Sequence, residues 1–411
     1  MIKMLHLADL HIGVENYGRL DSKTGLHTRL LDYLARLDEI VALSQTEKVD
    51  LVVIAGDIYK SRSPNPTHQR EFAQRVKQWR AAGVAVVLLT GNHDLSPAAG
   101  RASSIEIFRA LEVEGVTIAD RVKWHSIETR AGKVQIIAIP WITRHSLLTK
   151  DEMLRSSFSE IDAELRRKVE RFIEDKLEKE LDPTLPTVLA MHGTLNGAVF
   201  GAERQLTLGQ DLVFSRSAIA QAGIDYVALG HIHRHQTLGE HPPVVYAGSI
   251  ERIDFGEKDE DKGCVIVELV KNATRWRFQK LNARPFIALE VDVRTKNEPL
   301  ERIAAAIRKA SLQEAVVRLE IKATREQTAT LRQAEKNFRT QLEEAGAFLV
   351  AAIVIETEKA SQSRFSQAEK EALQSLNPRQ VLELYLQSKD IAPDRITTLL
   401  DAANELINAG E

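Results

Sequence analysis

Residues 84–94 read VAVVLLTGNHD, an apolar run that ends in an amide, an imidazole and a carboxylate. The run Val84–Leu89 is short, continuous and rich in valine, which is typical of a strand buried on both faces. On its own, GNHD fits an ordinary turn, because Gly, Asn and Asp tolerate the backbone angles that turns require. These polar residues gain a functional meaning only if other strands of the chain end in the same way.

Two upstream apolar runs, Met4–Ala8 and Leu51–Ala55, are also followed directly by polar residues. Stretches with helical character separate the runs: His27–Thr46, Thr67–Ala82 and Ala102–Leu111. This alternation of strands and helices predicts a layered α/β domain. Such folds bind their ligands at the carboxyl ends of the strands, which is where these polar residues stand.

A long amphipathic helix follows, with an apolar stripe from Leu154 to Leu177, and Pro183 and Pro186 end it. Short strands separated by turns then return. We expect them at Thr187–Met191, Asp225–Leu229, Pro243–Ala247, Cys264–Leu269 and Arg275–Leu281.

The last third of the chain has a different organisation. Residues 286–357 read as strand, helix, strand, helix, strand, and a polar linker then leads to two short helical patterns at 378–388 and 393–409. The apolar stripes of these two patterns have too little sequence around them to be buried locally. We expect three parts, with boundaries at 1–285, 286–357 and 358–411.

Composition bounds the function. The 411 residues are 44% hydrophobic and 27% charged, and the single cysteine, Cys264, excludes an intrachain disulfide. No apolar run reaches the roughly 18 residues of a membrane span, and no signal peptide is expected, so we predict a cytoplasmic protein without membrane contact. The net charge of −3 lacks the bulk basicity of proteins that coat nucleic acid. A polyanion would therefore be attracted by local patches or by metal ions.

Five polar clusters follow five of the predicted strands: D9-L-H11, G56-D57, N92-H93, H192-G193 and G230-H-I-H233. Each cluster alone has an ordinary explanation, such as a helix cap or a buried histidine with a hydrogen-bond partner. Five clusters in one structural context favour a metal site. In D-x-H and H-x-H both side chains point the same way if the segment is extended, and strands of one sheet bring their ends together.

The donor set indicates the chemistry. Two Asp, one Asn and four His without a thiolate suit divalent ions such as Mn²⁺, Fe²⁺ or Zn²⁺. Seven donors are too many for one catalytic ion with open positions. They suit two ions about 3.5–4 Å apart that share a carboxylate, an arrangement that serves in-line displacement at phosphorus. The sequence therefore predicts hydrolysis of a phosphoester.

The motifs D-x-H, GD, GNHD, H and GHxH, in this order, resemble those of the calcineurin-like metallophosphoesterase superfamily. Within it, L5-H-L-A-D-L-H-I-G13 and above all Y246-A-G-S-I-E-R-I-D-F-G-E257 are similar to the SbcD family of bacterial nuclease subunits, over nearly the whole chain. The resemblance implies an α/β fold in which a two-sheet metallophosphoesterase sandwich is flanked by helices. A small α+β capping domain that binds DNA and a C-terminal helical segment that binds a partner would complete it.

The resemblance also assigns roles to residues. Asp57 would bridge two ions, expected to be Mn²⁺, and His93 would protonate the leaving sugar oxygen as a general acid. Asp94 would fix the loop or act through a contact behind the ligands. The first ion would be held by Asp9, His11, Asp57 and His233, and the second by Asp57, Asn92, His192 and His231.

Lys60 departs from the family pattern, because related enzymes often carry Asp or His at this position, close to the catalytic histidine. Three explanations remain open from the sequence. Another group orients His93, Lys60 contacts the phosphate directly, or Lys60 is a solvated loop residue.

The expected function is that of an Mn²⁺-dependent DNA exonuclease and endonuclease acting on double-stranded ends, hairpins and single strands. The resemblance implies an SbcC-like ATPase partner that binds the tail, and a homodimer through helices 67–82 and 102–111, whose apolar stripes include Phe72, Val76 and Trp79. A phosphatase acting on small or phosphoprotein substrates is the alternative. Against it, the phosphoprotein enzymes carry GDxxDRG and GNHE, where this chain has G56-D-I-Y-K-S-R62 and GNHD. A DNA scaffold with a vestigial site is disfavoured, because every expected position is filled.

Overall fold

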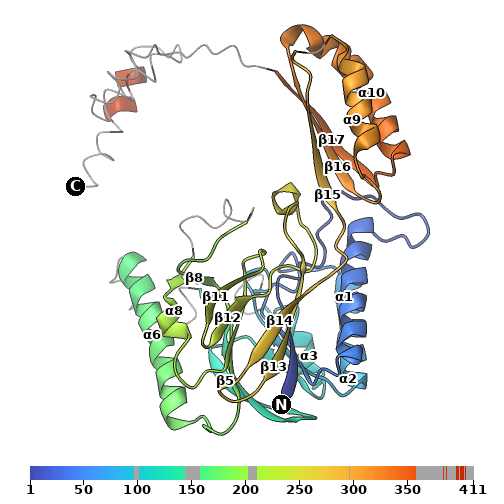
Figure 1. The fold of residues 1–411 in the computed structure, drawn as a ribbon. Coiled ribbons are helices and arrows are strands. Elements are labelled where there is room, and N and C mark those ends of the chain that lie inside the picture. The colour runs from blue at the N-terminus through green and yellow to red at the C-terminus, as the bar shows by residue number, and fades with distance from the viewer. Residues whose placement is uncertain are drawn as a thin grey trace.

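The computed structural model describes residues 1–96, 101–143, 158–201, 211–295 and 297–357, together with a few isolated positions between 383 and 403. Its larger lobe contains two six-stranded sheets packed face to face (Figure 1). The first sheet has the order β14-β13-β1-β2-β3-β4. Its strands are β1 (Ile2–Leu7), β2 (Leu51–Ile54), β3 (Ala85–Leu89), β4 (Val116–Ala119), β13 (Gly263–Leu269) and β14 (Arg275–Lys280).

The second sheet has the order β11-β12-β10-β7-β6-β5. Four of its strands run parallel, namely β6, β7, β10 and β12, just as β1 to β4 do in the first sheet. The strands are β5 (Lys123–Thr129), β6 (Gly132–Ile139), β7 (Thr187–His192), β10 (Tyr226–Gly230), β11 (Gln236–Glu240) and β12 (Pro243–Tyr246). A two-stranded ribbon, β8 (Thr194–Leu195) with β9 (Val213–Phe214), follows β7.

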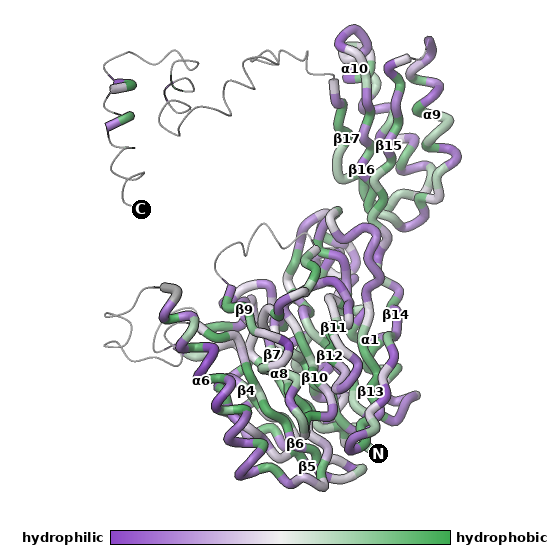
Figure 2. Tube along the Cα trace, turned by 60° about the vertical axis from the view of Figure 1, so that its left-hand side comes forward, coloured by the Kyte–Doolittle hydropathy of each residue, from purple (hydrophilic) through white to green (hydrophobic). Residues whose placement is uncertain are grey.

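The central strands are buried on both faces, as their continuous apolar runs predicted. In β1, Met4 faces the core between the sheets, whereas Leu5 and Leu7 face the outer layer of helices. Helices α1 (Thr28–Thr46), α2 (Pro66–Ala81) and α3 (Glu106–Ala110) cover the first sheet, and α6 (Phe158–Lys179) and α8 (Arg216–Ile219) cover the second. Figure 2 shows the strands of this lobe largely in green and the polar side of α6 in purple. The predicted two-sheet α/β sandwich flanked by helices is confirmed.

The smaller lobe has the predicted order of strand, helix, strand, helix, strand. Its three strands are parallel in the order β15-β16-β17, and their apolar side chains share a core with both helices. The elements are β15 (Phe286–Asp292), α9 (Pro299–Lys309), β16 (Val316–Ala323), α10 (Arg325–Glu344) and β17 (Leu349–Thr357).

The residues offered as a dimer surface lie in the interior of the protomer. Phe72, Val76 and Trp79 are at most 1% exposed and belong to the core beneath α1 and α2. The second expected helix is shorter than 102–111, because α3 covers Glu106–Ala110 only, and Leu111 beyond it is 68% exposed. The stripe that supported dimerisation was therefore wrongly interpreted, and the homodimer remains a prediction that rests on the resemblance.

The predicted tail helices at 378–388 and 393–409 fall almost entirely outside the described residues. Of the isolated positions that are described there, Leu386, Ile396 and Leu400 pack against one another. No helix within the described part of the chain has the length and apolar character needed to cross a bilayer.

Candidate metal centre

The predicted donor clusters converge at one end of the sandwich, although they come from both sheets rather than one. Asp9, Asp57 and Asn92 follow β1, β2 and β3 of the first sheet, whereas His192 ends β7 and His231 follows β10 of the second. The convergence arises because the parallel strands of both sheets end at the same edge of the sandwich. The prediction placed the donors at strand ends correctly, and its use of a single sheet was wrong.

The segments that carry the donors are not extended, contrary to the expectation for D-x-H. Asp9, His11, Asp57 and His231 have φ angles of 52°, 43°, 54° and 99°. Non-glycine residues seldom adopt positive φ, and such strained backbone gathers where function requires it. The loop after β1 is held against the loop after β2, since the His11 amide donates to the Asp57 carbonyl at 3.0 Å.

Two glycines of the motifs are required by close approach. A Cβ atom at Gly56 would lie 2.2 Å from His192 Nδ1, and one at Gly230 would lie 2.1 Å from the Ala55 carbonyl oxygen. Contacts this short cannot be relieved against backbone and a buried ring. Each glycine therefore lets one strand end approach the strand end of the other sheet.

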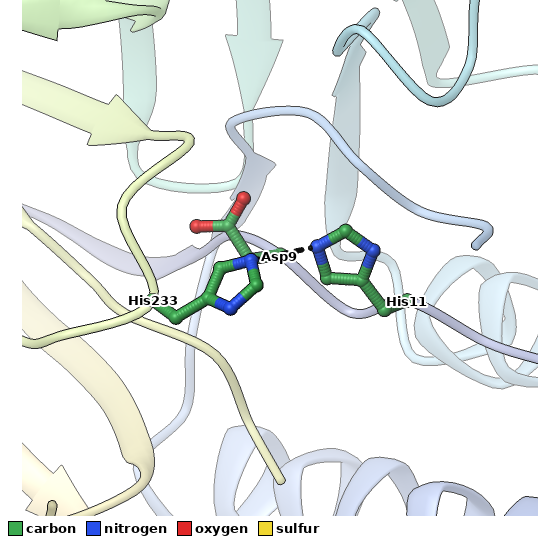
Figure 3. A group of neighbouring side chains, drawn as sticks. All are labelled: Asp9, His11 and His233. Carbon is green, nitrogen blue, oxygen red and sulfur yellow. Dashed lines mark hydrogen bonds between the residues drawn. The ribbon is translucent and has the colours of Figure 1, made fainter. Parts of the chain in front are cut away.

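A first group of donors consists of Asp9, His11 and His233, whose ligand atoms all lie within 4.8 Å of one another. Figure 3 shows the two imidazole rings meeting edge to edge beside the carboxylate. The Nε2 atoms of His11 and His233 are 3.0 Å apart. The Asp9 carboxylate also accepts the amide of His231 at 3.0 Å, which ties this group to the loop after β10.

A second group surrounds Asn92. Its side-chain oxygen lies 3.0 Å from His192 Nε2 and 3.3 Å from His231 Nδ1. Asp57 lies between the two groups, with Oδ2 at 3.4 Å from His192 Nε2 and 3.7 Å from His11 Nε2. Asp57 is thus the carboxylate that both groups share.

Hydrogen bonds on the far side of the rings fix two of the histidine tautomers. His192 Nδ1 lies 2.7 Å from the Ala55 carbonyl, and His233 Nδ1 lies 2.8 Å from Glu257 Oε1. These oxygens only accept hydrogen bonds, so each Nδ1 donates its proton and the neutral ring directs the Nε2 lone pair at the centre. Metal-binding histidines are held in this way.

The donor set therefore fits divalent cations. Two ligands held about 2.1 Å from one ion at a right angle lie about 3 Å apart, which is the spacing between the facing donor atoms. The lone pairs of His192 Nε2, Asn92 Oδ1 and Asp57 Oδ2 face one another within a buried space. Lone pairs so arranged repel one another unless a proton or a cation lies between them.

Electrostatics give the same indication. Asp9 and Asp57 are at most 2% exposed. Burial raises the pKa of Asp9 above its usual range. Burial also acts against the charged form of Asp57, but attraction to His192 and His11 outweighs it and lowers the Asp57 pKa. Burying two carboxylates is costly unless positive charge accompanies them.

Asp94 supports the loop and does not face the donors. Its carboxylate accepts three amides, those of Ile58 and Tyr59 after β2 and that of Gly91 after β3, at 3.0 to 3.1 Å. It thereby ties the GD loop to the GNHD loop. Burial, with a smaller contribution from Asp57, raises the pKa of Asp94 to about 6.

His93 lies at the margin of the centre. Its amide donates to Asp57 Oδ1 at 2.8 Å, and its ring meets that of His11 edge-on with centroids 5.0 Å apart. Its Nδ1 lies 2.7 Å from the main-chain carbonyl of Lys60. The group that orients His93 is therefore the backbone of residue 60, whose side chain is exposed. Of the three explanations left open by the sequence, this geometry supports the first.

Lys60→Ala is accordingly expected to leave hydrolysis of a small phosphodiester within about threefold of the wild-type rate, because the carbonyl that holds His93 remains. Steady-state kinetics on bis-p-nitrophenyl phosphate measure this. A loss of tenfold or more would instead show that the ammonium group contacts the phosphate.

Three residues around the centre were not predicted from the sequence to be functional. Asp211 Oδ2 lies 3.0 Å from His231 Nε2, Glu257 holds His233, and the Trp141 ring lies 4.8 Å from that of His231. Glu257 ends the Y246–E257 motif, so a signal existed. No signal marked Asp211. His235, the least certain of the remaining histidines, stacks on Phe278 outside the centre.

A sandwich of this kind, with these donors at the strand ends, defines a metallophosphoesterase. The family model of the calcineurin-like phosphoesterases matches residues 2–235, and the chain belongs to this family. It is therefore a metal-dependent phosphoester hydrolase.

Within the family, the chain is similar to SbcD, the smaller-lettered name given to one component of the nuclease SbcCD. It is 26% identical over 310 residues to SbcD of Escherichia coli (strain K12), with 73% of this chain and 74% of the relative covered. SbcD of Rhodobacter capsulatus is 27% identical, with 76% of each chain covered. The DNA double-strand break repair protein Mre11 of Haloferax volcanii is 26% identical, with 78% of this chain and 62% of the relative covered.

Proposed function

We propose that the chain is a two-metal DNA phosphodiesterase, the nuclease subunit of a complex that processes double-strand breaks and hairpins. The observation that carries the proposal is the position of Asp57 between two donor groups, with His93 beside it. The relatives named as SbcCD nuclease subunits and as a break-repair protein support DNA as the substrate.

The two groups of donors would each hold one divalent ion, with Mn²⁺ as the proposed metal. Such ions, when bound, supply a nucleophilic hydroxide and neutralise charge on the phosphate. The first would be held by Asp9, His11, Asp57 and His233, and the second by Asp57, Asn92, His192 and His231.

His93 would supply the proton for the leaving group. The Lys60 carbonyl holds its Nδ1–H, so that a protonated ring presents Nε2–H away from that contact. A histidine with a pKa near neutral is suited to this role, because it both carries and releases a proton at the operating pH. Nothing in this assignment requires His93 to bind a metal.

The substrate is tested by giving the purified protein blunt duplex DNA, hairpin DNA, bis-p-nitrophenyl phosphate and p-nitrophenyl phosphate, in Mn²⁺ and in Mg²⁺. We expect hydrolysis of DNA and of the diester, with Mn²⁺ preferred, and little turnover of the monoester. EDTA provides the metal-free control. Efficient monoester turnover without DNA cleavage would instead indicate the phosphatase.

The remaining proposals concern location and assembly. The protein would act in the cytoplasm, as a homodimer, with segment 378–409 bound to an SbcC-like ATPase. Deleting residues 366–411 should abolish binding to that ATPase while ATP-independent hydrolysis persists. Light scattering tests the dimer. Trp79→Glu is unsuitable for that purpose, because Trp79 is buried in the protomer.

A further inference from the structure

The short 3-10 turn η1 (Phe255–Glu257) lies between the smaller lobe and the metal centre. Its first residue, Phe255, packs against residues of the smaller lobe, namely Phe286 at the start of β15 and Val316 at the start of β16. The Phe255 and Phe286 rings meet edge-on with centroids 5.1 Å apart, and the Arg318 guanidinium lies 4.5 Å from the Phe255 centroid. Phe255 is thus a point of attachment for the smaller lobe.

The last residue of the same turn reaches the metal centre. Glu257 Oε1 accepts the Nδ1–H of His233 at 2.8 Å. Lys262 Nζ lies 2.8 Å from Glu257 Oε2 and 3.2 Å from the main-chain oxygen of His233. Both Glu257 and Lys262 are 1% exposed. The position of the His233 ring is therefore set by the position of the Glu257 carboxylate.

The turn is closed on itself, so that its two ends cannot move independently. Glu257 Oε2 accepts the amide of Ile253 at 3.0 Å, and the Asp254 side chain caps the turn by accepting the amide of Gly256 at 2.7 Å. Along the chain, the ring that contacts the smaller lobe and the carboxylate that holds a donor belong to the first and last residues of this one turn. A displacement of Phe255 must then displace Glu257 or break these hydrogen bonds.

We propose that η1 couples the placement of the smaller lobe to the geometry of His233, with Glu257 and Phe255 as positioning residues. With the smaller lobe docked on Phe255, Glu257 holds the His233 lone pair toward Asp9 and His11. A substrate that moves the smaller lobe would alter the affinity of the adjacent ion. The inference rests on the proposed metal centre, but it does not require DNA to be the substrate.

The test compares two phenylalanines at the same junction. Phe255 belongs to η1, whereas Phe348 contacts the Arg284 guanidinium at 3.7 Å and has no hydrogen bond or chain connection to η1. Metal-free Phe255→Ala, Phe348→Ala and Glu257→Gln proteins are titrated calorimetrically with Mn²⁺. Circular dichroism at the titration temperature verifies that each variant is folded.

We expect Glu257→Gln to weaken one Mn²⁺ site by about 10- to 100-fold, as the loss of a partner behind a ligand does. Phe255→Ala should weaken the same site by about 10-fold and leave the other unchanged. Phe348→Ala should leave both within twofold. Phe255→Leu should restore most of the affinity, and Phe255→Ala combined with Glu257→Gln should cost less than the two separate losses together.

An unchanged Mn²⁺ affinity in folded Phe255→Ala, or equal effects of Phe255→Ala and Phe348→Ala, would overturn the coupling. If Glu257→Gln alone were neutral, its role toward His233 would be wrong as well. Failure of the proposed function has a different signature. Wild-type protein would then bind Mn²⁺ with this pattern among the variants and fail to cleave DNA.

Discussion

Asp57→Ala is expected to remove metal from the centre and to abolish hydrolysis of both DNA and bis-p-nitrophenyl phosphate. Asp57 is the carboxylate between the two donor groups, 3.4 Å from His192 Nε2 and 3.7 Å from His11 Nε2. Its other oxygen accepts the amide of His93, so the substitution also frees the GNHD loop. Activity should fall to that of metal-free protein, because the chemistry depends on the ions.

Metal analysis by mass spectrometry, after passage through a desalting column, measures the first part of this prediction. Asp259→Ala is the matched control, since the Asp259 side chain is 85% exposed and remote from the donors. If Asp57→Ala retained both ions at wild-type affinity, the shared position of this carboxylate would have no role in binding.

His93→Ala is expected to keep the metal and to lose about 10²- to 10⁴-fold in the rate of DNA cleavage, the usual contribution of a general acid. The donor groups assigned to both ions do not include His93, and its Nδ1 is engaged by the Lys60 carbonyl. Exposed His241 provides the control, and His241→Ala should cleave DNA at the wild-type rate.

The leaving group offers a sharper version of this test. p-Nitrophenolate departs readily without a proton, whereas the sugar oxygen of DNA requires one. The loss in His93→Ala should therefore be smaller on bis-p-nitrophenyl phosphate than on DNA. Equal losses on both substrates, or a protein depleted of metal, would show that His93 is not the acid.

The sequence was sufficient for the elements that carry the donors. Runs such as Leu51–Ala55 and Val84–Leu89 matched β2 and β3 to within a residue, because a strand buried on both faces must be continuously apolar. Strand β11, at the edge of the second sheet, escaped detection. Its sequence QTLGE is partly exposed and has no apolar alternation, so its pairing with β12 comes from tertiary contact alone.

The donor residues were recognisable for a chemical reason, since few structural roles need so many histidines and carboxylates at strand ends. Their backbone was not recognisable, because positive φ at Asp9 and His11 is imposed by pairing with the loop after β2. Asp211 is separated by 20 positions from His231, the residue it contacts, and nothing in its own neighbourhood marks it. The apolar stripe of α2 showed that one face is buried, but it did not show whether the protomer or a second copy buries it.

The account depends most directly on there being two metal sites in one chain. Wild-type protein, freed of metal and titrated with Mn²⁺ under calorimetry, is predicted to bind two ions per chain, and Asp57→Ala to lose binding at both sites. A saturating stoichiometry of one ion per chain, or two ions whose binding is indifferent to Asp57, would contradict it.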